Sequence, residues 1–244
     1  MNPRGLRLAL ALSLLAGAAA AAPADFAGVW MRPSQKGGNY PRWLNPPIGR
    51  PPLKEPYASR YDADEKVRQT AEAAGEPIPT DKAQCLPDGM PFVMETSLPV
   101  EFLPVGGKIV QVFEFNTQVR HIYVDGRHPP PDELEFTFFG DSVGRWDGDD
   151  LVVETVGVRT PTLMFARAPH SEDLRIVERY HLLDSDLMKV TITMNDPQVL
   201  TAPWTVTRTF ARQPDIRIRE YVCLLNQRNF VDDAGRIGSV ILDR

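Results

Sequence analysis

The residues of this sequence that could do chemistry include charged side chains set among apolar ones in strand-like segments. In residues 174–184 (LRIVERYHLLD), Glu178 falls on the same side as four apolar residues, because strand side chains alternate strictly between two faces. The same pattern recurs in four further segments, at Arg120, Glu154, Arg208 and Glu220. An isolated buried charge is strongly unfavourable, so we expect these five side chains to meet.

A polar cluster of this kind inside an apolar barrel predicts a ligand pocket, with apolar walls and a few convergent polar groups. Glu178 is the group expected to move protons in such a pocket. The residues predicted to bind substrate are Arg120, Glu154, Arg208, Glu220, His170 and Trp146. Two alternatives stay open at this point: the charges form a purely structural ion-pair network, or the faces of some strands are inverted.

A second candidate for chemistry is the stretch HIYVDGRHPPP at residues 121–131. The Asp-Gly pair at 125–126 is preferred in two-residue type I′ hairpin turns. Such a turn would place Tyr123 opposite His128, with His121 on the same side. Histidine titrates near neutral pH, so this group favours general acid–base catalysis. The predicted catalytic residues are His121, Tyr123, His128 and Glu178.

Other interpretations of these histidines remain. They could be solvated residues at a hairpin end, or they could bind a metal together with Asp125 or Asp132. The spacing of the two histidines is weak evidence for a metal, and the prediction is that the protein binds none. His170 lies in a loop before a strand (APHSED), where it could join the rim of a barrel mouth.

The elements that must position these residues are short strands. From about residue 100, alternating segments are separated by Asn, Asp, Gly and Pro turn signals, which is typical of an antiparallel meander. The expected strands are residues 25–31, 108–115, 118–124, 134–140, 144–158, 174–184, 187–194, 204–212 and 216–225. So many consecutive strands predict a mostly all-β fold, closed into a barrel.

The N-terminal part is different in character. Prolines crowd residues 33–56, which predicts an extended arm on the surface. Residues 58–74 form the one expected helix, capped by Ser59 or Asp62 and ended by Gly75. The predicted organisation is a signal peptide (1–22), then arm, helix and loop (23–99), then the barrel (100–244).

Composition and targeting signals limit the function classes. The 244 residues carry a net charge of −5, with 43% hydrophobic and 24% charged residues, and no basic patch that would favour nucleic acid. Two arginines, an apolar run and small residues in positions 1–22 are typical of a cleaved secretory signal peptide, a membrane anchor being the alternative. No later segment is apolar enough to span a membrane. We therefore expect a periplasmic or secreted protein.

The two cysteines, Cys85 and Cys223, fit that compartment. An even count in an oxidising environment predicts a disulfide between them, rather than two buried thiols.

The chain also resembles a broad family of uncharacterised exported bacterial proteins. The resemblance rests on motifs that cover most of residues 85–229: CLPDGMP, IYVDGRHPP, GDSVGRWDGDDLVVETVGV, PHSEDLRIVERY, NDPQVLTAPWTVTRTF and EYVCLLNQRN. That family usually has histidine where this chain has Asp141. The AGVW stretch at residues 27–30, followed by a meander, is similar to the opening of lipocalin-like barrels, and this resemblance implies such a barrel.

These observations favour a protein that acts on a small apolar or aromatic molecule. The first hypothesis is a cofactor-independent acid–base enzyme of the lyase, hydratase or isomerase type, because no nicotinamide, flavin or haem motif is present. The first alternative is a non-catalytic, lipocalin-like binding protein for an apolar ligand. The second is a structural envelope protein whose proline-rich arm docks a partner. The ligand and the oligomeric state are left open.

Overall fold

The computed structural model describes residues 25–33, 41, 44–76, 78–79, 85–223, 229–231 and 237–239. The predicted signal peptide lies outside these residues. No helix within them is long and apolar enough to cross a membrane.

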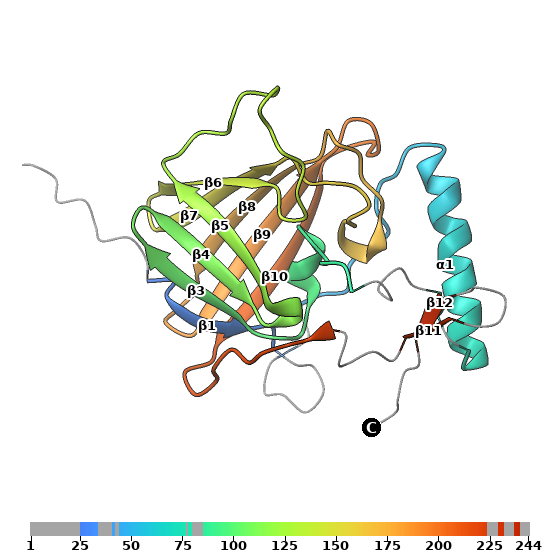
Figure 1. Cartoon of the computed structure of the whole chain (residues 1–244), viewed down its shortest axis with the longest axis horizontal. Coiled ribbons are helices and arrows are strands. Elements are labelled where there is room, and N and C mark those ends of the chain that lie inside the picture. The colour runs from blue at the N-terminus through green and yellow to red at the C-terminus, as the bar shows by residue number, and fades with distance from the viewer. Residues whose placement is uncertain are drawn as a thin grey trace, which may run out of the picture.

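Nine strands close into a barrel (Figure 1), which confirms the prediction of a mostly all-β barrel. Around the barrel the order is β1-β10-β9-β8-β7-β6-β5-β4-β3. The strands are β1 (Gly28–Met31), β3 (Val100–Val105), β4 (Lys108–Phe113), β5 (Gln118–Val124), β6 (Asp141–Asp147), β7 (Asp150–Val156), β8 (Arg175–Leu182), β9 (Leu187–Asn195) and β10 (Trp204–Arg212).

The alternation of apolar and polar residues produces the core. Strand β9 buries every second residue, and its inward residues Val190 and Ile192 pair with Tyr180 and Glu178 of β8. The inward positions of neighbouring strands continue these rows around the barrel. Large apolar side chains fill most of them, among them Phe102, Phe113, Ile122, Leu151, Met188 and Met194.

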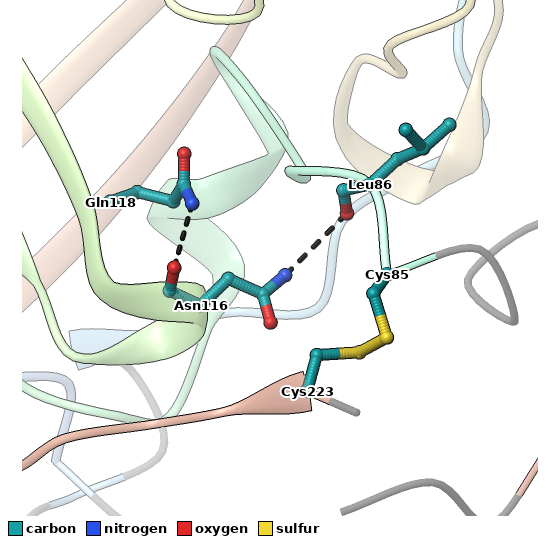
Figure 2. Close-up of a disulfide and its surroundings, with 5 residues drawn as sticks. All are labelled: Cys85, Leu86, Asn116, Gln118 and Cys223. Atoms are coloured by element: carbon teal, nitrogen blue, oxygen red, sulfur yellow. Dashed lines mark hydrogen bonds between the residues drawn. A yellow bond between two sulfur atoms is a disulfide. The ribbon is translucent and has the colours of Figure 1, made fainter. Parts of the chain in front are cut away.

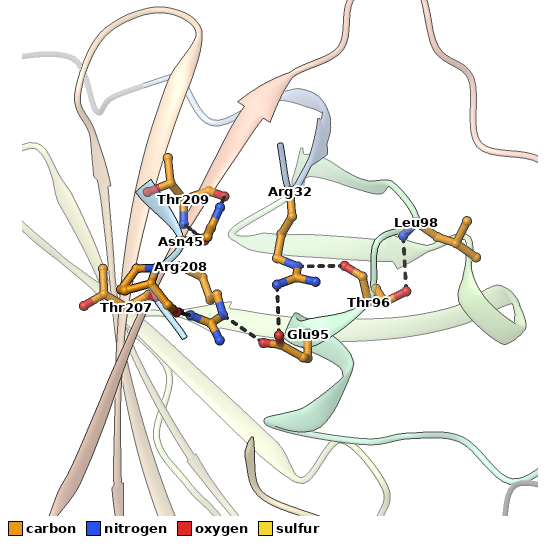
Figure 3. Close-up of polar contacts among 9 residues, drawn as sticks. Arg32, Asn45, Glu95, Thr96, Leu98, Thr207, Arg208 and Thr209 are labelled. Carbon is orange, nitrogen blue, oxygen red and sulfur yellow. Dashed lines mark hydrogen bonds and ion pairs between the residues drawn. The ribbon is translucent and has the colours of Figure 1, made fainter. Parts of the chain in front are cut away.

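The barrel closes through its first strand. β1 pairs with β3 on one side and with the end of β10 on the other. Beyond the end of β1, the side-chain amide of Asn45 pairs with the backbone of β10 in place of a strand. It donates to the Thr209 carbonyl (3.1 Å) and accepts from the Thr209 N–H (2.9 Å), as Figure 3 shows. The N-terminal segment is therefore part of the barrel wall.

One predicted strand and one predicted strand pairing were wrong. Residues 134–140 form only an isolated bridge, at Thr137, and β5 pairs with β6 in parallel. The type I′ hairpin is also absent: Asp125 adopts φ 56° and donates its N–H to Gly144, so the chain leaves the barrel instead of turning back. Since parallel strands need a long crossover, residues 125–140 return outside the barrel.

Residues 216–222 join no ladder and residue 223 begins a turn, so the strand expected at 216–225 is wrong as far as the structure describes it. The closed barrel has no free edge for it. Instead, the Thr117 hydroxyl bonds both the N–H and the carbonyl of Tyr221. A separate small sheet contains β11 (Asn229–Val231), β12 (Ile237–Ser239) and β2 (Ile78–Pro79).

The predicted helix is confirmed as α1 (Tyr57–Ala74), which stands beside one end of the barrel (Figure 1). Gly75 ends it in the left-handed conformation (φ 68°), where glycine carries no Cβ penalty. The predicted N-terminal caps were wrong: the helix begins after Pro56, and Glu55 Oε2 accepts from both the N–H (3.3 Å) and the hydroxyl (2.7 Å) of Ser59. The Tyr61 hydroxyl donates to the Ala166 carbonyl and ties the helix to the barrel.

Two 3-10 helices cover the same end: η3 (Phe92–Glu95) and η5 (Phe165–Arg167). The Val93 and Met94 side chains of η3 point into the core and are at most 1% exposed. A third short turn, η4 (Phe115–Thr117), connects β4 to β5.

The predicted disulfide is present. Cys85 and Cys223 are bonded across a sequence separation of 138 residues. Figure 2 shows that the Asn116 amide donates to the Leu86 carbonyl beside it, at 3.5 Å. The disulfide therefore fixes the start of the loop that leads into η3.

Candidate functional site

The barrel interior contains a polar cluster around Arg120 and Glu178, as the sequence predicted. The Glu178 carboxylate accepts from Arg120 Nη1 at 3.1 Å and from Nη2 in a short contact, and both side chains are fully buried. Four more inward polar residues complete this interior network: Gln111, Ser142, Thr155 and Tyr180. Five neighbouring strands, β4 to β8, supply its six members.

Every donor of the Arg120 guanidinium has an acceptor. Its Nε donates to Ser142 Oγ (3.0 Å), Nη1 to Gln111 Oε1 (3.0 Å), and Nη2 to Thr155 Oγ1 (2.7 Å). The two contacts with Glu178 use the remaining N–H groups. A guanidinium has five donors, so this one has none left for a ligand.

The electrostatics of the network favour a stable ion pair and a neutral phenol. Burial lowers the pKa of Arg120, but the Glu178 carboxylate and Tyr180 raise it more, and the net direction is upward. Burial and the neighbouring carboxylate raise the pKa of Tyr180, whose hydroxyl donates to Glu178 Oε1 at 2.6 Å. The network therefore holds its protons at neutral pH.

The interior network is also out of reach of solvent. Each member is at most 1% exposed. Three cavities lined by described residues lie outside the barrel interior, in loops and beside α1. A ligand could reach Glu178 only if the core opened, so this geometry favours the structural interpretation of the cluster.

The other three predicted members lie elsewhere, and their placement in the cluster was wrong. Glu154 alternates as expected, but on the outward face, where it pairs with Arg175 at 2.5 Å. Glu220 is exposed, in the extended segment after β10. Arg208 does face inward, but its Nε donates to Glu95 of η3 at 2.8 Å. A pattern of alternation cannot tell which face is inside, nor which loop closes the barrel end.

The predicted catalytic residues are not brought together. His121 and Tyr123 lie on the exposed outer face of β5, with ring centroids 6.3 Å apart. His128 lies in the crossover after β5, and Glu178 is inside the barrel. Since the hairpin does not form, the predicted pairing of Tyr123 with His128 was wrong.

His128 contacts two carboxylates instead of Tyr123. Its Nδ1 lies 2.5 Å from Asp141 Oδ1, and its Nε2 lies 3.3 Å from Glu154 Oε1. Nε2 is buried and makes no hydrogen bond with the residues that the structure describes. The Asp141 carboxylate therefore orients the imidazole.

His170 and Trp146 both lie against the core. The His170 ring is 6% exposed, its Nδ1 donates to the Ser171 carbonyl (2.7 Å) and its Nε2 lies 2.6 Å from the Thr162 hydroxyl. Burial lowers its pKa. Trp146, on the inward face of β6, stacks on Phe26 at 5.7 Å.

A pocket that sequence reasoning missed lies next to His170, at the barrel end covered by η3. We call it the end pocket; its lining is Leu86, Pro87, Asp88, Phe92, Phe138, Pro161, Thr162 and Leu163. Its cavity volume is only about 30 Å³, and it is open to solvent. Three of these residues come from the stretch CLPDGMP (residues 85–91), which was the sequence signal that could have indicated the pocket.

The walls of the end pocket are held rigidly. Met90 N–H donates to the Phe138 carbonyl at 2.9 Å, which joins the two sides. A Cβ on Gly89 would lie 2.4 Å from that same carbonyl oxygen and 2.6 Å from Thr162 Cγ2. Only glycine fits there, so backbone packing sets the shape of the pocket.

Among the described residues, no group of three or more His, Cys, Asp or Glu side chains is arranged to hold a metal ion. No family model, curated protein or solved structure matches the chain. A function for the chain therefore rests on its fold and on the geometry of these sites.

Proposed function

We propose that the chain is an exported binding protein for a small apolar or aromatic molecule, which it holds in the end pocket without catalysis. The observation that carries the proposal is a contrast between two sites. The interior network is complete and inaccessible, whereas the end pocket is open and lined by Phe92 and Phe138, with polar groups from Asp88 and Thr162. Apolar walls with a few polar groups are typical of small-molecule sites.

The size of the end pocket limits what enters it. Its cavity volume of about 30 Å³ has room for roughly one or two water molecules or a methyl group. The ligand would therefore insert one edge or substituent, with the rest of an apolar or aromatic body lying over the mouth. Leu86 is 40% exposed and extends the apolar surface there.

Export is part of the proposal. The disulfide supports an oxidising compartment, where such bonds persist. Purifying the mature protein from the periplasm or culture medium and sequencing its N-terminus tests this directly: a start near residue 22 or 23 is expected, and retention of the leader in the cytoplasm would contradict it.

Phe138→Ala tests the binding site, with Phe136→Ala as its matched control. Phe136 lies two residues away in the same crossover, is 40% exposed and does not line the pocket. The oxidised protein is screened by thermal shift against small aromatic molecules; a ligand at 100 times its Kd stabilises by about 2.7 kcal/mol. A hit should stabilise the wild type and Phe136→Ala but not Phe138→Ala. Equal stabilisation of both variants, or no hit, would overturn the proposal.

An acid–base enzyme is the second candidate, because His128 has the geometry of an oriented base. Asp141 holds one ring nitrogen. The other is buried, lies 3.3 Å from Glu154 Oε1 and makes no hydrogen bond within the described part of the chain, so a substrate would reach it by displacing the side chains that cover it. The matched control is His181, which also pairs with an aspartate, Asp150, at 2.6 Å. Conversion of a bound molecule by the wild type and by His181→Asn, but not by His128→Asn, would favour this function over simple binding.

A further inference from the structure

A second group of charges lies at the barrel end, and it is built differently from the interior network. Arg32 follows β1, Glu95 ends η3 and Arg208 faces inward from β10 (Figure 3). The Glu95 carboxylate bridges the two arginines: its Oε1 accepts from Arg32 Nη1 at 2.9 Å and its Oε2 accepts from Arg208 Nε at 2.8 Å.

The charge of this Arg32–Glu95–Arg208 cluster does not balance. Among the described residues, Glu95 is the only carboxylate in an ion pair with either arginine. The side chain of Arg208 is 3% exposed, that of Arg32 20% and that of Glu95 28%. Two cations and one anion therefore leave the cluster with a net charge of +1. The Phe165 ring, whose centroid lies 5.8 Å from Arg208 Cζ, carries no counter-charge, so a bound anion would be favourable.

The guanidinium groups also retain donors. Arg32 Nε donates to the Thr96 carbonyl, and Arg208 Nη1 donates to the carbonyls of Pro46 and Thr207. Within the described chain, the Nη2 groups of Arg32 and Arg208 have no hydrogen-bonding partner. Neither nitrogen is fully buried. Both Nη2 groups thus face space that solvent reaches.

The interior network shows how this same chain treats an arginine whose role is structural. Arg120 has one carboxylate for its one charge, and all five of its donors are used. Arg208, almost as buried, shares its carboxylate with a second arginine and leaves an amino group open. The difference points to a ligand rather than to packing.

The environment of Arg32 supports the same conclusion. Burial lowers its pKa, Glu95 raises it, and the charge on Arg208 lowers it again. The two guanidinium groups therefore sense each other's positive charge across the single carboxylate. A bound anion would relieve this repulsion.

We propose that the Arg32–Glu95–Arg208 cluster binds one carboxylate anion, which accepts from an open Nη2 group and balances the excess charge. The planar guanidinium matches a carboxylate in shape and donor geometry. A single negative charge brings the cluster to neutrality. This site is separate from the end pocket and does not depend on the proposed function.

Sodium acetate at pH 7, compared with sodium chloride at equal ionic strength, is the probe. The melting temperature of the oxidised full chain is followed as a function of acetate concentration, which yields a Kd. Arg32→Gln removes one open donor group and the excess charge, and should weaken acetate binding at least tenfold. Arg50→Gln is the control, since Arg50 pairs with Asp62 on the surface and is 53% exposed.

Glu95→Gln makes the test sharper, because it should act in the opposite direction. Removing the competing carboxylate leaves two uncompensated arginines, so acetate should bind about tenfold more tightly than in the wild type. If Glu95→Gln does not fold, the comparison of Arg32→Gln with Arg50→Gln still decides. Equal acetate effects in Arg32→Gln and Arg50→Gln, or weaker binding by a folded Glu95→Gln, would overturn the proposal.

Discussion

Replacing Glu178 by glutamine should destabilise the protein strongly, because it leaves Arg120 charged and without its counter-ion in the core. The two side chains are fully buried, and the carboxylate accepts from Arg120 and from Tyr180. Glutamine has nearly the same size, so packing is preserved. Its amide nitrogen, however, is a donor and must face another donor of Arg120 or Tyr180.

The expected loss follows from the burial of the pair. Removing one partner of a buried ion pair costs about 3–5 kcal/mol. This is a large part of a typical stability of about 5–15 kcal/mol. Glu154→Gln is the matched control, because Glu154 lies on the adjacent strand but pairs with Arg175 on the outer face, where the side chains are 31% and 54% exposed. An exposed pair contributes about 1 kcal/mol or less.

Urea unfolding of the oxidised proteins measures both values. With an m-value of about 3 kcal/mol per M or less, Glu178→Gln should lower the midpoint by about 1 M or more. Ligand binding by the fraction that folds should be unchanged. If Glu178→Gln costs no more than Glu154→Gln, or abolishes binding while leaving stability intact, the cluster is a ligand site and the structural interpretation is wrong.

Three further predictions concern stability. Gly89→Ala should lower the free energy of unfolding by about 2–5 kcal/mol, because φ is +66° and a Cβ would lie 2.4 Å from the Phe138 carbonyl oxygen. Gly106→Ala is the control: φ is +53° but the space is open, so only the conformational penalty of about 1–2 kcal/mol is expected. Equal losses of stability in thermal unfolding would refute the role of the Phe138 contact. Reducing the disulfide should lower stability by up to about 5 kcal/mol, the chain-entropy value for a separation of 138 residues, and an unchanged melting temperature would contradict the expectation. Because the pKa of His170 is lowered in the folded protein, the unfolded chain protonates this imidazole more readily, and stability should fall as the pH drops below about 6.5. In His170→Asn, stability should depend less on pH between pH 7.5 and 5.

Several features of the fold follow from short-range pattern. The period of two in β8, β9 and β10 was enough to predict strands and to place Glu178 and Arg208 on inward faces, because backbone geometry forces side chains to alternate. The end of the helix at Gly75 was predictable, because glycine adopts the left-handed conformation without support from tertiary contacts. The disulfide followed from the count of two cysteines.

The site was predicted only in part. Arg120 and Glu178 were paired correctly, since a buried charge requires a partner. Glu154 was placed on the wrong face, because Val152 beside it is apolar and only 4% exposed although it lies outward. Glu95 was overlooked, because it lies in a proline-rich loop and its role depends on where η3 packs.

The sequence by itself determined most of the strands, their alternation, the helix, the cysteine pair and the need for buried charges to meet, since each depends on neighbouring residues or on the cost of removing a charge from water. Only the tertiary structure decided the parallel pairing of β5 with β6, the crossover that separates Tyr123 from His128, and the sharing of Glu95 by Arg32 and Arg208. These contacts join residues far apart in the chain. They depend on how the barrel closes, which no local pattern encodes.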